Sequence, residues 1–282
     1  MNPRAVALAK GAAHVASPPL VYDRLNQVLA HPHCGSADIA RVISEDPGLT
    51  SRLLKLVNSG FFGFPQPVES VAKAVTVVGT QQIRDLALAT SVISAFDRVP
   101  TELVDLEAFW FHSLACGVMA RVIASHRGAD NVERFFVAGL LHDIGHLVIY
   151  VGAGAQAFDI LERTQTTGQP HLACERAVLD TDHTEVGGAL MAAWNLPDAL
   201  QEAVTWHHDP LSAEQYQVEA SAVHVAEVTA HGLGWGKSGD GRLPPFVGDA
   251  WEILGLSVDD VPTLVSEAEV QLESALHLMG AS

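Results

Sequence analysis

The stretch "FVAGLLHDIGHLVIY", residues 136–150, places three ionisable side chains in a run that is otherwise apolar. These are His142, Asp143 and His146. Such a run predicts a buried helix, and buried polar groups cost roughly 2–7 kcal/mol each unless they find partners. On one helix, His142 and His146 would lie four residues apart and share a face. The stretch therefore predicts either mutually bonded core side chains or a metal site.

The segments that precede this stretch also have helical patterns, and sustained two-residue alternation is absent. Asp46 followed by Pro47 is typical of a helix start, and Asn58-Ser59-Gly60 of a helix end. We therefore predict a compact cluster of helices over residues 15–98. Residues 1–14 precede it, as a tail or a short first helix.

A second set of helices is predicted over residues 99–282, after the break at Pro100. Residues 232–245 are rich in Gly and Pro and predict a long surface loop. The overall expectation is an all-helical fold of two packed bundles. The helices expected in the second bundle cover about 105–126, 131–150, 155–167, 171–180, 183–194, 197–208, 218–231 and 263–279.

Composition opposes binding to nucleic acids and membranes. The formal charge is −17, and residues 101–282 carry twenty-six acidic side chains against seven basic ones. Phosphate contacts supply most nucleic-acid affinity, and anionic lipids repel negative charge, so this half suits neither partner. Residues 36–58 could form a helix-turn-helix, but their second helix offers only Arg52 and Lys55. No apolar run approaches the roughly 20 residues that cross a bilayer.

The three cysteines lie far apart, without a CxxC pair, at Cys34, Cys116 and Cys174. This pattern indicates a reduced, cytoplasmic protein, in which such residues usually serve as small buried hydrophobes.

Histidines are concentrated in the acidic half, which holds eleven of the fourteen. Imidazoles and carboxylates are ligands that divalent metals use, and the core between facing helices is a usual place for a metal site. Core histidines bonded to carboxylates remain the other interpretation. Besides the quoted stretch, the candidates at helix positions that could face one core are His112, His183, His207, His208 and Glu227.

Several long segments follow one another in a familiar order: "SPPLVYDRLNQVL", "DIARVISEDPGLTSRLLKLVNS", "SVAKAVTVVGTQQIRDLAL", "LLHDIGHL", "DHTEVGGALMAAWNLP" and "AVTWHH". Over roughly residues 15–235 the chain resembles the HDOD family, the HD-related output domains of bacterial signalling proteins. That family is related to the HD metal-dependent phosphohydrolases, whose pattern is His … His-Asp … Asp.

The resemblance implies a set of metal-ligand positions at His112, His142, Asp143, His183, His207, His208 and Glu227. The first three match the HD pattern itself. The next three match additional positions of the dinuclear HD-GYP relatives, which hydrolyse cyclic di-GMP. Glu227 stands where those enzymes carry their closing Asp. The implied cofactor is one or two divalent ions of Fe, Mn or Zn.

Four departures from the active relatives are visible. His146 replaces the lysine of "HDIGK", Glu227 is one methylene longer than Asp, and no "GYP" follows the His pair. Relatives that hold three ions have a carboxylate four residues before the first histidine, where this chain has Ala108. We therefore expect at most two ions, and no efficient hydrolysis of cyclic di-GMP.

Two functions follow as hypotheses. The first is a non-catalytic HDOD signalling module that contacts signalling proteins in trans, because 282 residues leave no room for a further domain. The alternative is a metal-dependent phosphohydrolase or phosphodiesterase acting on a phosphate ester or nucleotide, with Asp143 as its catalytic residue. Phosphate recognition normally needs Arg or Lys, and the ligand motifs contain none. The oligomeric state is left open.

Overall fold

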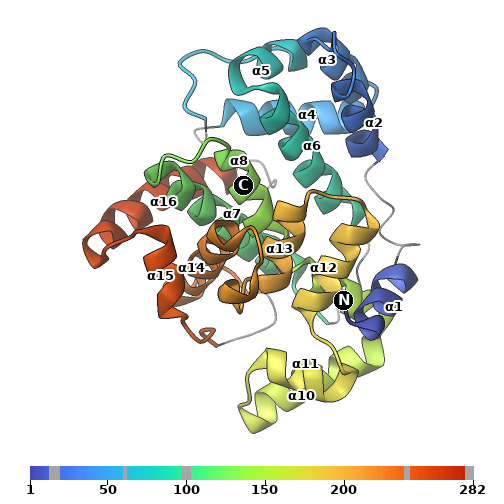
Figure 1. Cartoon of the computed structure of the whole chain (residues 1–282), viewed down its shortest axis with the longest axis vertical. Helices are drawn as coiled ribbons and strands as arrows, with labels where there is room; N and C mark the ends of the chain where they lie inside the picture. Colours follow the sequence, from blue (N-terminus) through green and yellow to red (C-terminus); the bar gives the residue numbers. More distant parts are fainter. Residues whose placement is uncertain (13–19, 60–61, 97–98, 100–102, 238–241, 277–282) are drawn as a thin grey trace.

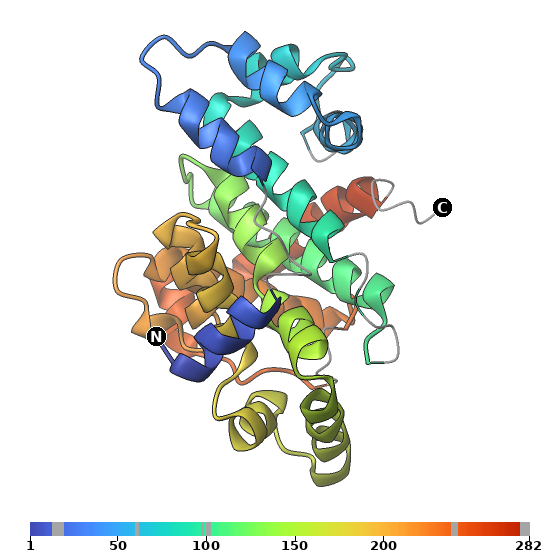
Figure 2. The same ribbon diagram turned by 90° about the vertical axis from the view of Figure 1, so that its right-hand side faces the viewer.

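The computed structural model describes residues 1–12, 20–59, 62–96, 99, 103–237 and 242–276. Within these ranges every regular element is a helix and no strand is found, which confirms the all-helical prediction. Figure 1 shows the helices of residues 20–95 as one group above a larger group, and the turned view in Figure 2 shows the same separation. The boundary between the two bundles was expected at residues 98–99, and residue 98 lies outside the described ranges.

The first bundle consists of α2 (Leu20–Leu29), α3 (Ser36–Ser44), α4 (Pro47–Asn58), α5 (Val71–Val78) and α6 (Thr80–Ala95). The Asp46 side chain accepts a 3.0 Å hydrogen bond from the backbone N–H of Leu49 and so caps α4, as its position before Pro47 predicts. The helix α6 packs against α8 of the second bundle, and Asn131 donates to Asp85 of α6 over 3.2 Å.

The second bundle is built around α7, which packs against α8, α14 and α16. The pair α10–α11 lies at the end of the molecule opposite the first bundle (Figure 1). The elements are α7 (Leu106–His126), α8 (Val132–Leu141), α9 (Ile144–Gly152), α10 (Gly154–Thr167), α11 (His171–Leu179), α12 (His183–Ala193), α13 (Asp198–Trp206), η1 (Pro210–Ser212), α14 (Gln217–Leu233), α15 (Gly248–Leu254), η2 (Val258–Asp260) and α16 (Val261–Leu276).

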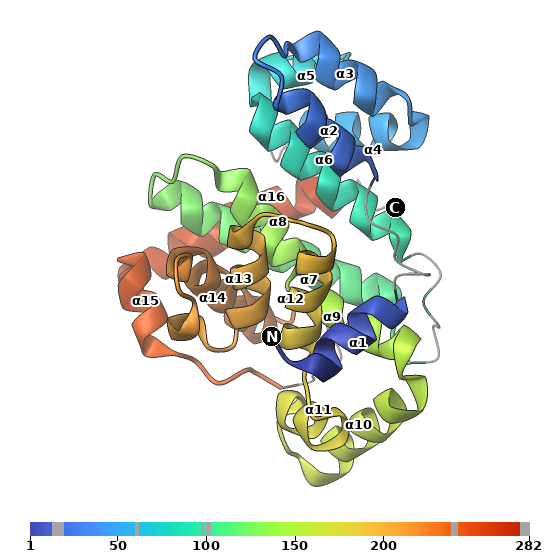
Figure 3. The same cartoon turned by 45° about the vertical axis from the view of Figure 1, so that its right-hand side comes forward.

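The beginning of the chain forms a helix, α1 (Pro3–Ala12), rather than a tail. It packs against α9 and α12, and its Ala5 and Ala9 are almost fully buried (Figure 3). The Asn2 side chain donates to Glu185 of α12 over 2.8 Å. Of the two alternatives expected for this segment, the structure shows the short first helix; Lys10, which interrupts the apolar run in the sequence, lies on its exposed face.

The quoted stretch is not one helix. The helix α8 ends at Leu141, and α9 begins at Ile144. Asp143 has φ −95° and ψ 9°, which bends the chain between the two helices. His142 and His146 therefore do not share a face of one helix, contrary to the periodicity argument. The break places Asp143 at the point where α9 meets α12.

Two glycines allow helices near this break to pack with unusually close backbones. A Cβ atom on Gly145 would lie 1.9 Å from the carbonyl oxygen of His183, so α9 rests directly on the first turn of α12. A Cβ on Gly117 would lie 2.7 Å from the carbonyl oxygen of Phe136, which brings α7 equally close to α8. These contacts set the spacing of the helices that carry the candidate ligands.

Residues 232–245 are not simply a surface loop. The helix α14 continues to Leu233, and the next residues run against α7. The backbone N–H of Lys237 donates to the carbonyl of Ala108 over 3.2 Å, and Gly236 has φ 75° where a Cβ would clash with His112. Residues 238–241 lie outside the described ranges. Further along, α15 was not predicted from the sequence.

By length and composition, two segments could cross a membrane: Leu106–His126 and Val132–Gly152. A few polar residues interrupt each segment, so neither is the continuous apolar run that the sequence-based expectation considered. Most of each segment is buried inside the protein, as in the core helices of soluble domains.

Candidate metal centre

The structure brings the seven candidate ligands into one buried region of the second bundle. His112 lies within α7, His142 and Asp143 lie between α8 and α9, and His183 is the first residue of α12. The remaining three are His207 and His208, directly after α13, and Glu227 in α14. All are buried except His208, which is partly exposed. They form overlapping groups in which the possible ligand atoms lie within 4.8 Å of one another.

Three of the histidines are oriented in the same way. The Nδ1 atoms of His112, His142 and His207 lie 3.0, 2.7 and 2.8 Å from the backbone carbonyls of Trp235, Gly139 and Val204. A carbonyl can only accept, so each Nδ1 carries a proton, and in the neutral imidazole the lone pair is on Nε2. Metal-ligating histidines almost always donate their second nitrogen in this manner.

Asp143 lies at the centre of these rings. Its carboxylate oxygens are 3.1 Å from Nε2 of His142, 3.5 Å from Nε2 of His183 and 3.8 Å from Nε2 of His207. Burial favours the neutral acid, but the surrounding imidazoles outweigh it and hold the pKa of Asp143 well below its ordinary value. Burial likewise disfavours a charged His142, yet the Asp143 carboxylate raises the pKa of that imidazole to about 9.

Nε2 of His207 has no hydrogen bond within the described part of the chain. Native proteins rarely leave buried polar atoms unpaired, because each costs about 1–3 kcal/mol. The Asp143 carboxylate and Nε2 of His142 form a buried ion pair at 3.1 Å, and a bound cation would take the place of the proton between them. The donor set of imidazole nitrogens and a carboxylate therefore fits a divalent cation.

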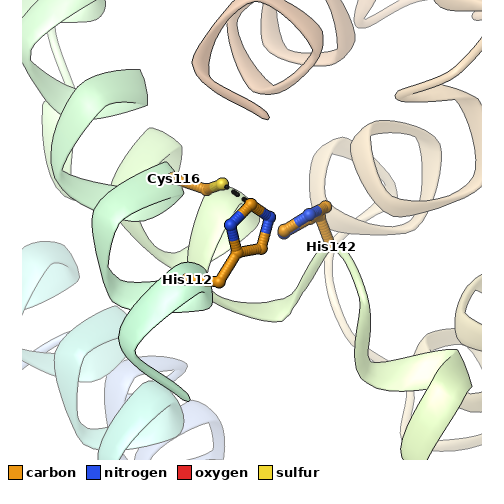
Figure 4. Close-up of side chains that lie close together, drawn as sticks. All are labelled: His112, Cys116 and His142. Atoms are coloured by element: carbon orange, nitrogen blue, oxygen red, sulfur yellow. Dashed lines mark hydrogen bonds between the residues drawn. The ribbon is translucent and has the colours of Figure 1, made fainter. Parts of the chain in front are cut away.

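His112 lies between Cys116 and His142 (Figure 4). The Cys116 Sγ atom is 3.4 Å from Nε2 of His112, one helical turn along α7. Burial lowers the pKa of His112 to about 3 and raises that of the Cys116 thiol well above its usual value. Both groups are thus neutral, and the thiol can donate weakly to the imidazole. Cys116 was expected only as a buried hydrophobe, although its spacing of four from His112 places it on the same helix face.

Residues 15–210 match the HDOD domain family, and this match covers more than half of the chain. The chain belongs to the HDOD family. This confirms the family suggested by the sequence motifs.

Two solved structures share the fold of this HDOD protein. An HDOD domain protein of unknown function from Geobacter sulfurreducens is 23% identical, with a TM-score of 0.77 and coverage of 96% of this chain and 97% of that chain. A protein from Shewanella amazonensis SB2B, provisionally named a phosphohydrolase, is 24% identical, with a TM-score of 0.76 and coverage of 96% and 98%. At these identities the likeness concerns the fold alone.

An uncharacterized protein of Treponema pallidum is 27% identical to this HDOD protein over 222 residues. The match covers 78% of this chain and 42% of the relative. The chain therefore spans less than half the length of the curated relative that it matches.

Glu227 and His208 close one side of the HDOD site. His208 Nδ1 lies 3.5 Å from the Glu227 carboxylate, and its Nε2 lies 3.2 Å from Nε2 of His183. Burial lowers the pKa of His207 and of His208 well below the ordinary value, and neighbouring histidines act in the same direction. Neutral imidazoles are the form that binds metals.

His224 of this HDOD protein has a structural role instead. Its Nδ1 donates to the carbonyl of His207 over 2.8 Å, and its Nε2 accepts from the backbone N–H of Val247 over 2.9 Å. Both nitrogens are therefore used. His224, Glu227 and His231 follow one another at spacings of three and four along α14, yet of the three Glu227 alone belongs to a potential ligand group among the described residues.

Sequence reasoning missed Glu175 of α11, which is 1% exposed. Its Oε2 atom accepts from the backbone N–H of His183 over 3.0 Å and lies 2.6 Å from Nδ1 of the same residue. The sequence did offer one indication: Glu175 stands four residues after His171, a spacing that places a histidine and a carboxylate on the same face of a helix. His146, one of the three ionisable side chains of the stretch 136–150, lies beside it.

A cavity of about 310 Å³ lies next to Asp143 in this HDOD protein. His183, His208 and Glu227 line its inner part, and Pro244 and Pro245 line another side. Among the described residues that line it, Arg176 is the one arginine or lysine, and its Nε is 2.7 Å from Asp182.

Proposed function

We propose that this HDOD protein is a signalling module that holds one or two divalent metal ions and acts through contacts with other signalling proteins. The observation that carries the metal assignment is the shared orientation of His112, His142 and His207. Each donates Nδ1 to a carbonyl, which leaves Nε2 for a ligand: those of His142 and His207 lie 3.1 and 3.8 Å from Asp143, and His112 lies beside His142. Nε2 of His207 has no hydrogen-bond partner among the described residues, which a core of mutually bonded side chains would have provided.

The candidate ligands fall into two sets that overlap at His207. His142, Asp143, His207 and Glu227 would hold one ion, with His112 beside His142, and His183, His207 and His208 would hold another. A divalent cation in this position supplies Lewis acidity, and Fe, Mn and Zn all suit these donors. The carbonyl contacts keep each ring turned towards the ion and in the tautomer that ligation requires.

Metal analysis of protein purified without chelator tests this proposal. We expect one or two equivalents of Fe, Mn or Zn per chain by elemental analysis. Adding the metal to stripped protein should raise the free energy of unfolding by about 2.7 kcal/mol at about 100 times Kd. Fewer than half an equivalent, together with no thermal shift from any of the three metals, would contradict the metal assignment.

The proposed partners and cellular location follow from the acidic charge of residues 101–282 and the absence of a CxxC pair. The charge opposes nucleic acids and anionic membranes, which leaves proteins as the partners, acting in trans. The free cysteines agree with a cytoplasmic location.

The second candidate function is a metal-dependent phosphohydrolase, and the cavity beside Asp143 favours it. Arg176 lines this cavity and could bind a phosphate group of a phosphate ester or nucleotide. It would have to exchange its contact with Asp182 for the substrate. In this function Asp143 would be the catalytic residue, orienting the reacting groups within the metal centre.

A hydrolysis screen separates the two functions. Metal-loaded protein is incubated with phosphate esters, nucleotides and cyclic di-GMP, and phosphate or nucleotide products are measured. The signalling proposal predicts no turnover, including none of cyclic di-GMP. Turnover that Arg176→Ala and Asp143→Asn abolish, but that Arg163→Ala leaves unchanged, would establish the enzyme. Arg163 is a suitable control because it is exposed on α10 and pairs with Asp159.

A further inference from the structure

We propose that His146 is an additional metal ligand of this chain, and that Glu175 is the positioning residue that holds His146 and His183 as a pair. This inference rests on the metal site proposed above. It concerns a position where the active relatives have lysine, which would bring a positive charge instead of a lone pair.

The carboxylate of Glu175 faces both histidines. Its Oε2 atom lies 2.6 Å from Nδ1 of His183, and its Oε1 atom lies 3.1 Å from Nδ1 of His146. All three side chains are at most 3% exposed. A carboxylate that accepts from Nδ1 leaves the lone pair of the imidazole on Nε2 and increases its basicity. The contact of Glu175 with His183 is such a hydrogen bond, while its contact with Nδ1 of His146 has the distance of an ion pair. Glu175 thus sets the tautomer of His183 and places a carboxylate against Nδ1 of His146.

The two rings are stacked, and each has its Nδ1 at Glu175 and its Nε2 on the side of Asp143. The ring centroids of His146 and His183 are 3.9 Å apart, with 20° between the planes. Nε2 of His183 is 3.5 Å and Nε2 of His146 is 3.8 Å from the same oxygen of Asp143. Two ligands of one ion, each bonded at about 2.1 Å, lie roughly 3–4 Å apart. Asp143, His146 and His183 are therefore spaced as ligands of one ion.

His171 approaches Glu175 from another side and provides the comparison. Its Nε2 lies 3.5 Å from Oε1 of Glu175, and its Nδ1 lies 3.3 Å from the hydroxyl of Thr164. It is as buried as His146. Among the described residues, His171 belongs to a potential ligand group with His146 and Glu175 that does not include Asp143. A change at His171 thus disturbs the same buried region without removing a nitrogen that faces Asp143.

Nuclear magnetic resonance of cadmium-loaded protein tests the assignment of His146. The protein carries isotope-labelled histidine, and an NMR-active cadmium isotope replaces the native metal. Scalar coupling between cadmium and a ring nitrogen then identifies each ligating histidine directly. Relative to wild type, we expect His146→Asn to lose one cadmium-coupled Nε2 signal and His171→Asn to lose none. His146→Lys, which restores the residue of the active relatives, is expected to show the same loss. It provides the test if the asparagine variant does not fold.

The possible outcomes are distinct. Wild-type protein that takes up no cadmium or other divalent metal would overturn both the metal centre and this inference. Normal uptake with an unchanged coupling pattern in the His146 variants would overturn this inference alone. Loss of a coupled nitrogen in His171→Asn would place an ion between His171 and Glu175, which also contradicts the assignment.

Glu175→Gln tests the positioning role. The amide offers one acceptor where the carboxylate offers two, so one of the two rings loses its partner. We expect metal affinity to fall about 10–100-fold, in a competition with a coloured chelator. The nitrogen shifts should also show that His183 or His146 of the stripped protein changes from one tautomer to a mixture. Unchanged tautomers would mean that Glu175 contributes only packing.

Discussion

Asp143→Asn is expected to lower the affinity for the divalent ion by more than about 100-fold, so that dialysed protein retains almost none. Removing an outer-shell partner typically costs 10–100-fold, and Asp143 is the group on which the candidate ligands converge. The amide keeps the shape of the side chain but loses the negative charge that faces His142, His183 and His207. Elemental analysis and chelator competition measure the effect.

Asp85→Asn is the matched control for this variant. Asp85 is 2% exposed and pairs with Arg84, but it lies in α6 and outside the candidate site. Its variant should bind metal as wild type does. Equal metal content in the two variants, with both proteins folded by circular dichroism, would show that Asp143 is not a ligand.

Gly145→Ala is expected to lower the free energy of unfolding by about 3 kcal/mol, at the upper end of the usual cost of overpacking. The new methyl group would overlap the carbonyl of His183, and backbone atoms cannot move aside as a flexible side chain can. The helices α9 and α12 must separate, which also moves His183 away from Asp143. Denaturant unfolding measures the first effect, and metal affinity measures the second.

Gly152→Ala, at the other end of α9, controls for the change in backbone freedom. A Cβ there would meet its nearest neighbour, Leu8, at 3.8 Å, an ordinary contact. We expect a change of less than about 1 kcal/mol, in the stabilising direction. Similar stabilities for the two alanine variants would contradict the close packing described for Gly145.

Much of the fold could be predicted because helix periodicity and helix ends are local properties of a sequence. The positions of α4, α7 and α10, for example, follow from capping residues and apolar spacing. The break between Leu141 and Ile144 could not be predicted in this way. The run 136–150 is apolar on every side, so its periodicity contains no signal that the chain turns there. The break depends on tertiary packing, through the contact of Gly145 with α12.

The candidate site could likewise be predicted only in part from the sequence. The histidines of the ligand set could be selected because ionisable groups stand out in apolar helices and match a family pattern. Glu175 could not, because glutamate is common on helix surfaces and nothing in "LACERAVL" distinguishes a buried one. Its role depends on how α11 packs beside the start of α12. The same holds for Trp235, whose contribution to the orientation of His112 is a backbone carbonyl.

The helix α8 connects the first bundle to the candidate metal centre. It packs against α6 of the first bundle, and it ends directly at His142 and Asp143. Any molecule that binds the first bundle and shifts α6 along α8 would therefore change the positions of His142 and Asp143 in the proposed metal centre. By thermodynamic reciprocity, the factor by which such a molecule changes metal affinity equals the factor by which metal changes the affinity for that molecule. The occupancy of the metal centre and the occupancy of the first bundle would then report on each other.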